Sequence, residues 1–178
     1  MMLLRLAAAG LLALSAGQAG VVAAQDSSEP ADVLPEAHRP IFYPADIDGP
    51  AVLDRALTHA AASKAKAVIV FGADWCHDSR ALAQVLTSAA FNREFGSRFE
   101  VTFINVGRPQ TGEGRNLDLV KRLGVQNLKS TPALFVLRGD SKLLNGKKDA
   151  VSWRNAESRG TDKVLAWFRG FDRKHTSD

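Results

Sequence analysis

Cys76 is the side chain in this sequence whose position most favours chemistry. It follows an apolar run at residues 68–71, which predicts a buried strand, and it precedes a stretch whose apolar residues recur at helical spacing. A helix N-terminus offers unpaired N–H groups and a partial positive charge, and both stabilise a thiolate over a thiol. Because the thiolate is the nucleophile, this location favours thiol chemistry over the alternative of a small buried apolar cysteine.

The residues beside Cys76 could take part in such chemistry. Trp75 could shield and flank the sulfur or pack on a neighbouring loop. His77 could stabilise a thiolate when protonated, or lie in solvent in the first helical turn. Ser79 could donate a hydrogen bond to the thiolate and help to keep it ionised. The two acidic neighbours are interpreted as ordinary residues of the helix cap region: Asp74 and Asp78.

Hydrophobic patterning predicts the elements that would position these residues. Strands are expected at residues 41–43, 68–71, 101–106, 133–137 and 142–144. Helices are expected after Asp48, Cys76, Asn116 and Thr161. Alternating strands and helices imply an α/β fold with parallel strand pairs and helices on both faces of the sheet, and the last two strands would add an antiparallel edge.

Two segments resemble those of thioredoxin-like proteins. Residues 71–79 end in Trp-Cys-x-x-Ser, which is similar to the Trp-Cys-x-x-Cys segment that these proteins carry after their central strand. Residues 130–133, Ser-Thr-Pro-Ala, look like their cis-proline loop. The resemblance covers roughly residues 41–168. It implies a thioredoxin-like fold, with a central mixed sheet flanked by helices on both faces, and it implies that Thr131 and Pro132 lie against Cys76 and could contact an extended substrate segment.

The sequence departs from this family at two positions. Ser79 replaces the second cysteine of the motif, and Val70 stands where thioredoxins carry a buried aspartate. A serine hydroxyl cannot release a mixed disulfide as a second cysteine does. We therefore expect monothiol exchange by Cys76 on protein or glutathione mixed disulfides, resolved by an external thiol. Glutathione is a possible co-substrate, and no other cofactor or metal is expected. The chain would then be a possible thiol–disulfide oxidoreductase that lacks an internal resolving cysteine.

Two other functions stay open at this level. The loss of the second cysteine is equally compatible with a redox-inactive binding module that recognises a partner segment at the Thr131-Pro132 groove. A further alternative is a pair of chains bridging an iron–sulfur cluster through Cys76 and external thiols.

Residues 107–115 form a long polar segment with two interpretations. The segment could form one wall of a substrate groove, with Arg108 or Arg115 attracting a carboxylate, or it could be a flexible insertion.

The composition of the chain limits the classes of molecule that we expect it to bind. The 178 residues carry a net charge of +4, and the charges are spread along the chain instead of forming a basic run, so nucleic acid is not an expected partner. With a single cysteine, neither an internal disulfide nor a Cys₂His₂ zinc site can form. The oligomeric state is left open, apart from a possible disulfide-linked dimer through Cys76 in an oxidising compartment.

The N-terminal segment is interpreted as an export signal. Residues 1–24 have a short basic start, an apolar centre and small residues before a possible cleavage site, which is the layout of a secretory signal peptide. An uncleaved membrane anchor is the alternative. Residues 25–40 would be a flexible leader, 41–170 the thioredoxin-like domain and 171–178 a polar tail. The domain is therefore expected outside the cytoplasm, in the periplasm or secreted.

Overall fold

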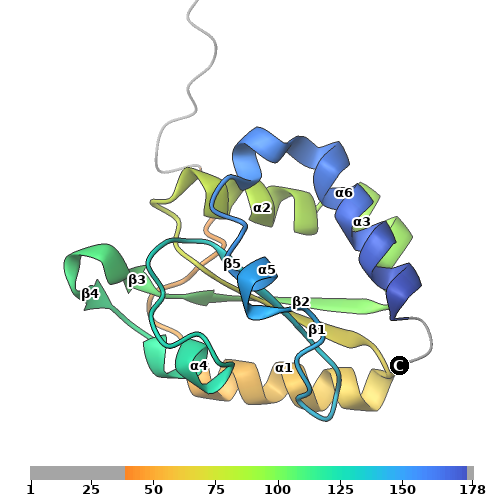
Figure 1. Ribbon diagram of the computed structural model, residues 1–178, viewed down its shortest axis with the longest axis horizontal. Helices are drawn as coiled ribbons and strands as arrows, with labels where there is room; N and C mark the ends of the chain where they lie inside the picture. Colours follow the sequence, from red (N-terminus) through yellow and green to blue (C-terminus); the bar gives the residue numbers. More distant parts are fainter. Residues whose placement is uncertain (1–38, 176–178) are drawn as a thin grey trace, which may run out of the picture. The chain divides into compact units, whose positions relative to one another are not determined.

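The computed structural model describes residues 39–175, which form a mixed α/β domain around a central sheet (Figure 1). The sheet has three strands in the order β2-β1-β5. The middle strand, β1 (Lys66–Gly72), pairs in parallel with β2 (Phe99–Asn105) and antiparallel with β5 (Ala133–Leu137). The mixed α/β class expected from the sequence is therefore confirmed.

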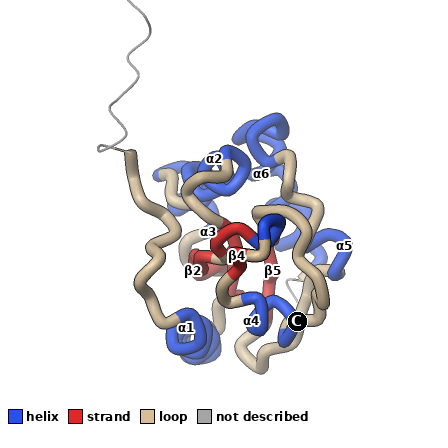
Figure 2. The backbone as a smooth tube through the Cα atoms, turned by 90° about the vertical axis from the view of Figure 1, so that its left-hand side faces the viewer, coloured by secondary structure: helices blue, strands red, loops and turns tan. Residues whose placement is uncertain are grey.

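Helices cover both faces of the sheet. Their bounds are α1 (Gly49–Ser63), α2 (His77–Leu86), α3 (Ala89–Phe95), α4 (Leu117–Arg122), α5 (Lys147–Ala150) and α6 (Ala156–Lys174). Figure 2 shows α2 and α6 on one side of the strands, with α1 and α4 on the other. No helix within residues 39–175 is both long and apolar enough to cross a membrane.

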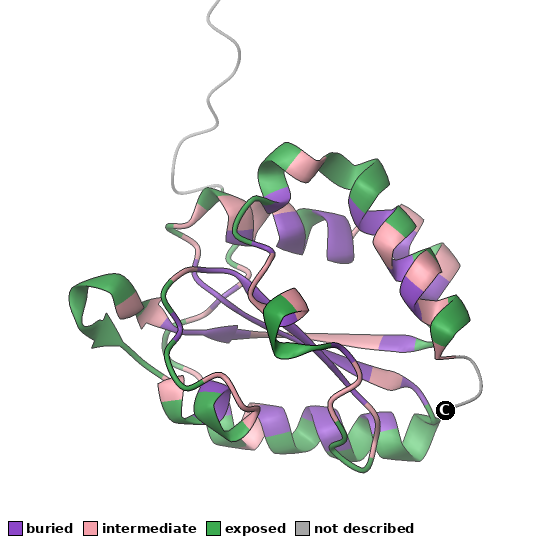
Figure 3. Cartoon of the chain, viewed as in Figure 1, coloured by how far each residue is buried: buried purple, intermediate pink, exposed green. Residues whose placement is uncertain are grey.

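The side chains of β1 divide between two cores. Val68 and Val70 point into a core shared with α2, α3 and α6, whereas Ala67, Ile69 and Phe71 point into a second core shared with α1 and α4. All five are fully buried. A strand that is buried on both faces needs an unbroken apolar run, which is why residues 68–71 are recognisable in the sequence. Figure 3 shows this burial along the strands and on the inner faces of the helices.

Helix α1 begins through local capping. The Asp48 side chain accepts a hydrogen bond from the Ala51 N–H, with 3.1 Å between oxygen and nitrogen, and Pro50 lies in the first turn, where it has no hydrogen bond to lose. The apolar face that follows packs on the second core through Leu53 and Leu57.

Residues 41–43 do not form the expected strand. The backbone N–H groups of Phe42 and Tyr43 instead donate to the two carboxylate oxygens of Asp74, each at 3.0 Å. The Tyr43 carbonyl accepts a hydrogen bond from the Asn105 side-chain amide at 2.6 Å. The segment is thus held by side chains, and the prediction of a strand there is wrong.

The expected strand at residues 142–144 is reduced to one isolated bridge between Leu137 and Leu143. Two backbone hydrogen bonds flank this bridge, from the Arg138 N–H to the Lys142 carbonyl at 3.0 Å and from the Leu144 N–H to the Val136 carbonyl at 2.8 Å. Beyond them, the buried side chain of Asn145 takes over along β5. It accepts from the Val136 N–H at 2.8 Å and donates to the Leu134 carbonyl at 2.9 Å. One amide group therefore occupies the position that a neighbouring backbone would take.

The helical segments also differ in detail from the expectation. The helix predicted after Cys76 is two helices, because Ser88 caps α3 by accepting from the Phe91 N–H at 3.1 Å. Helix α6 starts at Ala156 but is interrupted at Gly160 (φ 73°), directly before the expected start at Thr161.

The end of α6 lies beyond the boundary expected at residue 170. The helix continues to Lys174, and Phe171 is buried in the first core, so the polar tail begins later than predicted. The predicted signal segment and nearly all of the leader, residues 1–38, lie outside the described residues.

Candidate functional site

Cys76 is the N-cap residue of α2. Its backbone is extended (φ −91°, ψ 120°), and its carbonyl accepts the first hydrogen bond of the helix from the Arg80 N–H at 3.1 Å. Its own N–H is bonded to the Ala73 carbonyl at 3.1 Å, immediately after β1. The residue is half-buried, and its N-cap position places it at a helix N-terminus.

The loop before β5 lies directly against this sulfur. The Cys76 thiol donates to the Thr131 carbonyl oxygen, with 3.5 Å between sulfur and oxygen. The peptide bond between Thr131 and Pro132 is cis, and both residues are buried. Two segments that the sequence separates by more than fifty residues therefore meet at one end of the sheet, between the starts of α2 and β5.

Ser79 is oriented differently from the expectation. It is fully buried, and its hydroxyl finds no hydrogen-bond partner among the described residues, so the expected hydrogen bond to Cys76 is wrong. The first turn of α2 directs this side chain onto the end of β1. A Cβ added to Gly72 would lie only 2.8 Å from the Ser79 hydroxyl oxygen, and this close approach explains why glycine occupies that position.

Tyr43 completes the buried wall behind Ser79. Its hydroxyl donates to the Ser79 carbonyl at 3.1 Å, and its ring is 1% exposed. Burial, and then the nearby charges of Asp74 and Cys76, raise the pKa of Tyr43 well above its ordinary value of 10.0. The phenol therefore stays neutral and keeps donating across the physiological pH range.

Trp75 rests on the segment after β2. Its indole N–H donates to the Gly107 carbonyl at 2.9 Å, and the Arg108 guanidinium lies 5.1 Å from the ring centre. Residues 107–114 form a small hairpin in which β3 (Gly107–Arg108) and β4 (Glu113–Gly114) flank the short 3₁₀ helix η2 (Pro109–Thr111). Trp75 directly precedes Cys76 and is 42% exposed, and its indole connects the Cys76 loop to this hairpin.

The two arginines considered as carboxylate ligands are both engaged elsewhere. Arg108 lies over Trp75, and the Arg115 guanidinium donates to the Ala45 carbonyl at 2.9 Å. His77 is exposed in the first turn of α2, and its ring forms no hydrogen bond with a described residue. The site that the structure assembles therefore consists of Cys76, Thr131 and Pro132, with Trp75 at its rim.

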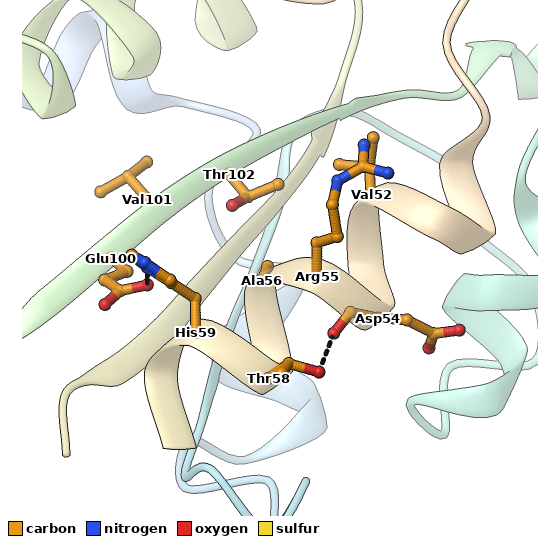
Figure 4. A pocket seen from close by; sticks show the side chains of 9 residues that line it. All are labelled: Val52, Asp54, Arg55, Ala56, Thr58, His59, Glu100, Val101 and Thr102. Atoms are coloured by element: carbon orange, nitrogen blue, oxygen red, sulfur yellow. Dashed lines mark hydrogen bonds and ion pairs between the residues drawn. The ribbon is translucent and has the colours of Figure 1, made fainter. Parts of the chain in front are cut away.

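A larger hollow lies away from this site. It has a volume of about 670 Å³ and lies between α1 and β2, where the His59 ring and the Glu100 carboxylate are 2.9 Å apart (Figure 4). None of the sequence-predicted site residues lines it. Within the part of the chain that the structure describes, no group of three or more acidic, histidine or cysteine side chains could hold a metal ion.

Comparison with known proteins identifies the fold. No family model matches the chain, and no curated protein matches it. A solved structure described as a disulphide isomerase from Xylella fastidiosa Temecula1 is similar over 74% of this chain and 96% of its own, with 26% identity and a TM-score of 0.64. The chain has a thioredoxin-like fold. The fold class expected from the sequence is thus confirmed.

Two carboxylates near Cys76 hold neighbouring backbone segments in a way that the sequence does not predict. The Asp78 carboxylate accepts from the Glu157 N–H at 2.9 Å and so ties the start of α2 to the start of α6. The Asp74 carboxylate fixes residues 42 and 43 beside the Cys76 loop. The sequence indicates only ordinary cap residues at both positions, because their partners are backbone groups that sequence spacing does not reveal.

Proposed function

We propose that this protein is a thiol–disulfide exchange protein that acts on the disulfides of other proteins through one thiol, that of Cys76. The observation that carries the proposal is the position of the Cys76 sulfur at the start of α2, 3.5 Å from the Thr131 carbonyl. The similar solved structure, a disulphide isomerase, supports the same general chemistry.

The exchange takes place in two successive steps. The Cys76 thiolate attacks one sulfur of a substrate disulfide, so that a new S–S bond forms to Cys76 while the substrate's own S–S bond breaks and its second sulfur leaves as a thiolate. An external thiolate then attacks the mixed disulfide and frees Cys76. If this second thiolate belongs to the same substrate, the disulfide is rearranged with no net change in oxidation state. If it belongs to glutathione or another small molecule, that thiol becomes disulfide-bonded to the substrate as Cys76 leaves. A second such thiol must then attack this bond before the substrate is fully reduced and the two small thiols are oxidised to their own disulfide.

The chain supplies the attacking group but not the resolving one. Cys76 is its single cysteine, and Ser79 stands at the second position of the motif. A hydroxyl is far less acidic than a thiol and cannot replace it in the second step. The release of the substrate therefore depends on a thiol from outside the chain.

Export fits this chemistry. Disulfides persist in oxidising compartments outside the cytoplasm. Residues 1–24 have the layout of a signal peptide, which would deliver the domain to the periplasm or the exterior.

The proposal can be tested by moving the single cysteine to a position that is not at a helix N-terminus. The full chain and a Cys76→Ser/Thr58→Cys variant would be mixed with a neutral peptide disulfide, and adducts would be followed by intact mass spectrometry. Thr58 is exposed in the interior of α1, so its cysteine lacks a helix N-terminus. We expect a reducible adduct on the native chain to form about tenfold faster than on the variant.

The adducts and the binding of the peptide together decide the proposal. No adduct on the native chain, or equal rates for the two proteins, would contradict it. Cys76→Ser alone should abolish the adduct. Peptide binding that persists in Cys76→Ser, without any adduct on the native chain, would favour the binding-module alternative that the loss of the second cysteine leaves open.

A further inference from the structure

A second hollow, of about 390 Å³, lies beside the Thr131-Pro132 loop. It is bounded by the chain between α4 and β5 and by the residues in and after α5, which lies next to β5 in Figure 1. Four cationic side chains line it: Lys129, Lys147, Lys148 and Arg154. We call this feature the basic hollow.

The charges of the basic hollow are not neutralised within the described residues. None of its four cations forms an ion pair or a side-chain hydrogen bond with a described residue, and all four are exposed. No acidic side chain lines it, because the neighbouring Asp149 instead contacts the Asn145 amide at 3.3 Å. Like charges around a concave surface reinforce one another's field and attract anions.

The walls between these charges are apolar. Val125, Leu128 and Val151 line the same hollow, and Leu128 is 5% exposed. The Lys147 stem lies against Gly124, where an added Cβ would come within 2.5 Å of the lysine Cε. The lysine stem is thus packed on the protein while its ammonium group remains available, an arrangement that suits a ligand with both an apolar part and negative charge.

The basic hollow lies close to the reactive sulfur. Ser130 lines it and directly precedes Thr131, whose carbonyl oxygen is 3.5 Å from the Cys76 sulfur. Because a residue spans at most about 3.6 Å, the hollow opens on the order of 10 Å from the sulfur. An extended peptide attached to Cys76 would reach it within about three to four residues.

We infer that the basic hollow binds an acidic segment of the substrate, about three to four residues from the cysteine that forms the mixed disulfide with Cys76. This inference rests on the proposed function and names its substrate class. Four cations match a peptide with several carboxylates. Glutathione carries an ammonium group along with its carboxylates and would leave part of the positive charge unmatched.

The test compares two peptide disulfides that are identical except for a run of three glutamates or three glutamines, which begins about three residues from the cysteine. The rate of adduct formation on the full chain would be measured at low salt. We expect the glutamate peptide to react about tenfold faster, and we expect salt to reduce the difference because it screens exposed charges. A Lys129→Glu/Lys148→Glu variant should lose the preference.

A matched variant separates the effect of the lysines in the basic hollow from the effect of a lower net charge. Arg55→Glu/Arg93→Glu has the same net charge, but both positions are exposed and lie outside the basic hollow. It should keep the preference for glutamate. Equal rates for the two peptides on the native chain, or equal losses in both variants, would overturn the inference while leaving the proposed exchange intact.

A non-covalent measurement keeps the inference testable without exchange. Versions of both peptides with serine in place of cysteine would be titrated by fluorescence anisotropy. Tighter binding of the glutamate peptide that is lost in Lys129→Glu/Lys148→Glu would support the basic hollow even if no adduct forms, in which case only the proposed function fails. A dependence on these lysines that appears with glutathione disulfide but not with the peptide would overturn the inference.

Discussion

At the scale of single residues, Ser79 and Cys76 lie within one turn of each other at the start of α2 but face different surroundings. Its side chain faces the core, where the hydroxyl oxygen finds no partner among the described residues, while the neighbouring Cys76 faces the Thr131 carbonyl. A buried hydroxyl without a partner costs free energy that an apolar side chain of similar size does not.

Ser79→Ala should therefore stabilise the protein slightly without impairing the thiol. We expect the free energy of unfolding, measured by urea denaturation, to rise by about 1 kcal/mol. The rate at which iodoacetamide alkylates Cys76 should stay within about twofold of the native rate. A loss of alkylation of about fivefold or more would show that the hydroxyl supports the thiolate after all.

The sequence identifies some of these residues better than others. The contact between Cys76 and Thr131 could be predicted from the sequence. Each residue lies at the end of a recognisable element, and the resemblance to thioredoxin-like proteins implies that the two lie against each other. The orientation of Ser79 could not be predicted, because it depends on the close approach of Gly72 and Tyr43. Tyr43 is contributed by a segment that has no regular structure of its own.

At the scale of elements, the outer edge of β5 is completed by a side chain. The Asn145 amide bonds both to the Val136 N–H and to the Leu134 carbonyl, and it is 4% exposed. This arrangement satisfies two buried backbone groups that would otherwise need a fourth strand.

Asn145→Ala should be strongly destabilising. It leaves the Val136 N–H and the Leu134 carbonyl buried without these partners, so we expect a loss of about 2–4 kcal/mol in the free energy of unfolding. Chemical denaturation monitored by circular dichroism would measure it. Asn127→Ala, at an exposed position in the loop before β5, is the control and should change stability by less than about 0.5 kcal/mol. Similar small effects for both variants would contradict this role of Asn145.

Elements could be predicted where the chain's own pattern forms them. The apolar runs of β1 and β5 and the cap of α1 are local signals, and the structure has these elements close to their expected bounds. Residues 41–43 and 142–144 carry similar strand-like patterns. However, the backbone of residues 42 and 43 bonds to the Asp74 carboxylate, and the backbone pairing of residues 142–144 with β5 gives way to the Asn145 amide. Periodicity does not identify side-chain partners of this kind.

At the scale of the whole described domain, one sheet separates two cores. Residues of β1 alternate between them, so a loss of packing on one face is transmitted to the other through the same strand. Trp153 and Trp167 belong to the side of α6, whereas Leu53 lies across the sheet beneath α1.

Leu53→Ala should therefore destabilise both cores equally. We expect a loss of about 2–5 kcal/mol, because Leu53 is fully buried. In a Trp75→Phe background, the fluorescence of Trp153 and Trp167 and the circular dichroism should shift to the same lower urea midpoint. A fluorescence transition that stays in place while the circular dichroism shifts would indicate that the two cores unfold independently.

The basic hollow also belongs to this scale. Its cations come from positions between residues 129 and 154, separated by β5 and the Asn145 turn. In the sequence they read as scattered surface charges. Only the fold gathers them beside the loop that contacts Cys76.

The presence of a single cysteine has a consequence for timing. A protein with two neighbouring thiols limits the lifetime of its own covalent complexes, because the second thiol ends them from within. Here a captured partner that does not resolve the bond with a thiol of its own would remain attached until a small thiol arrives by diffusion. The dwell time of each covalent encounter would therefore be set by the surroundings, long where free thiols are scarce and short where they are plentiful.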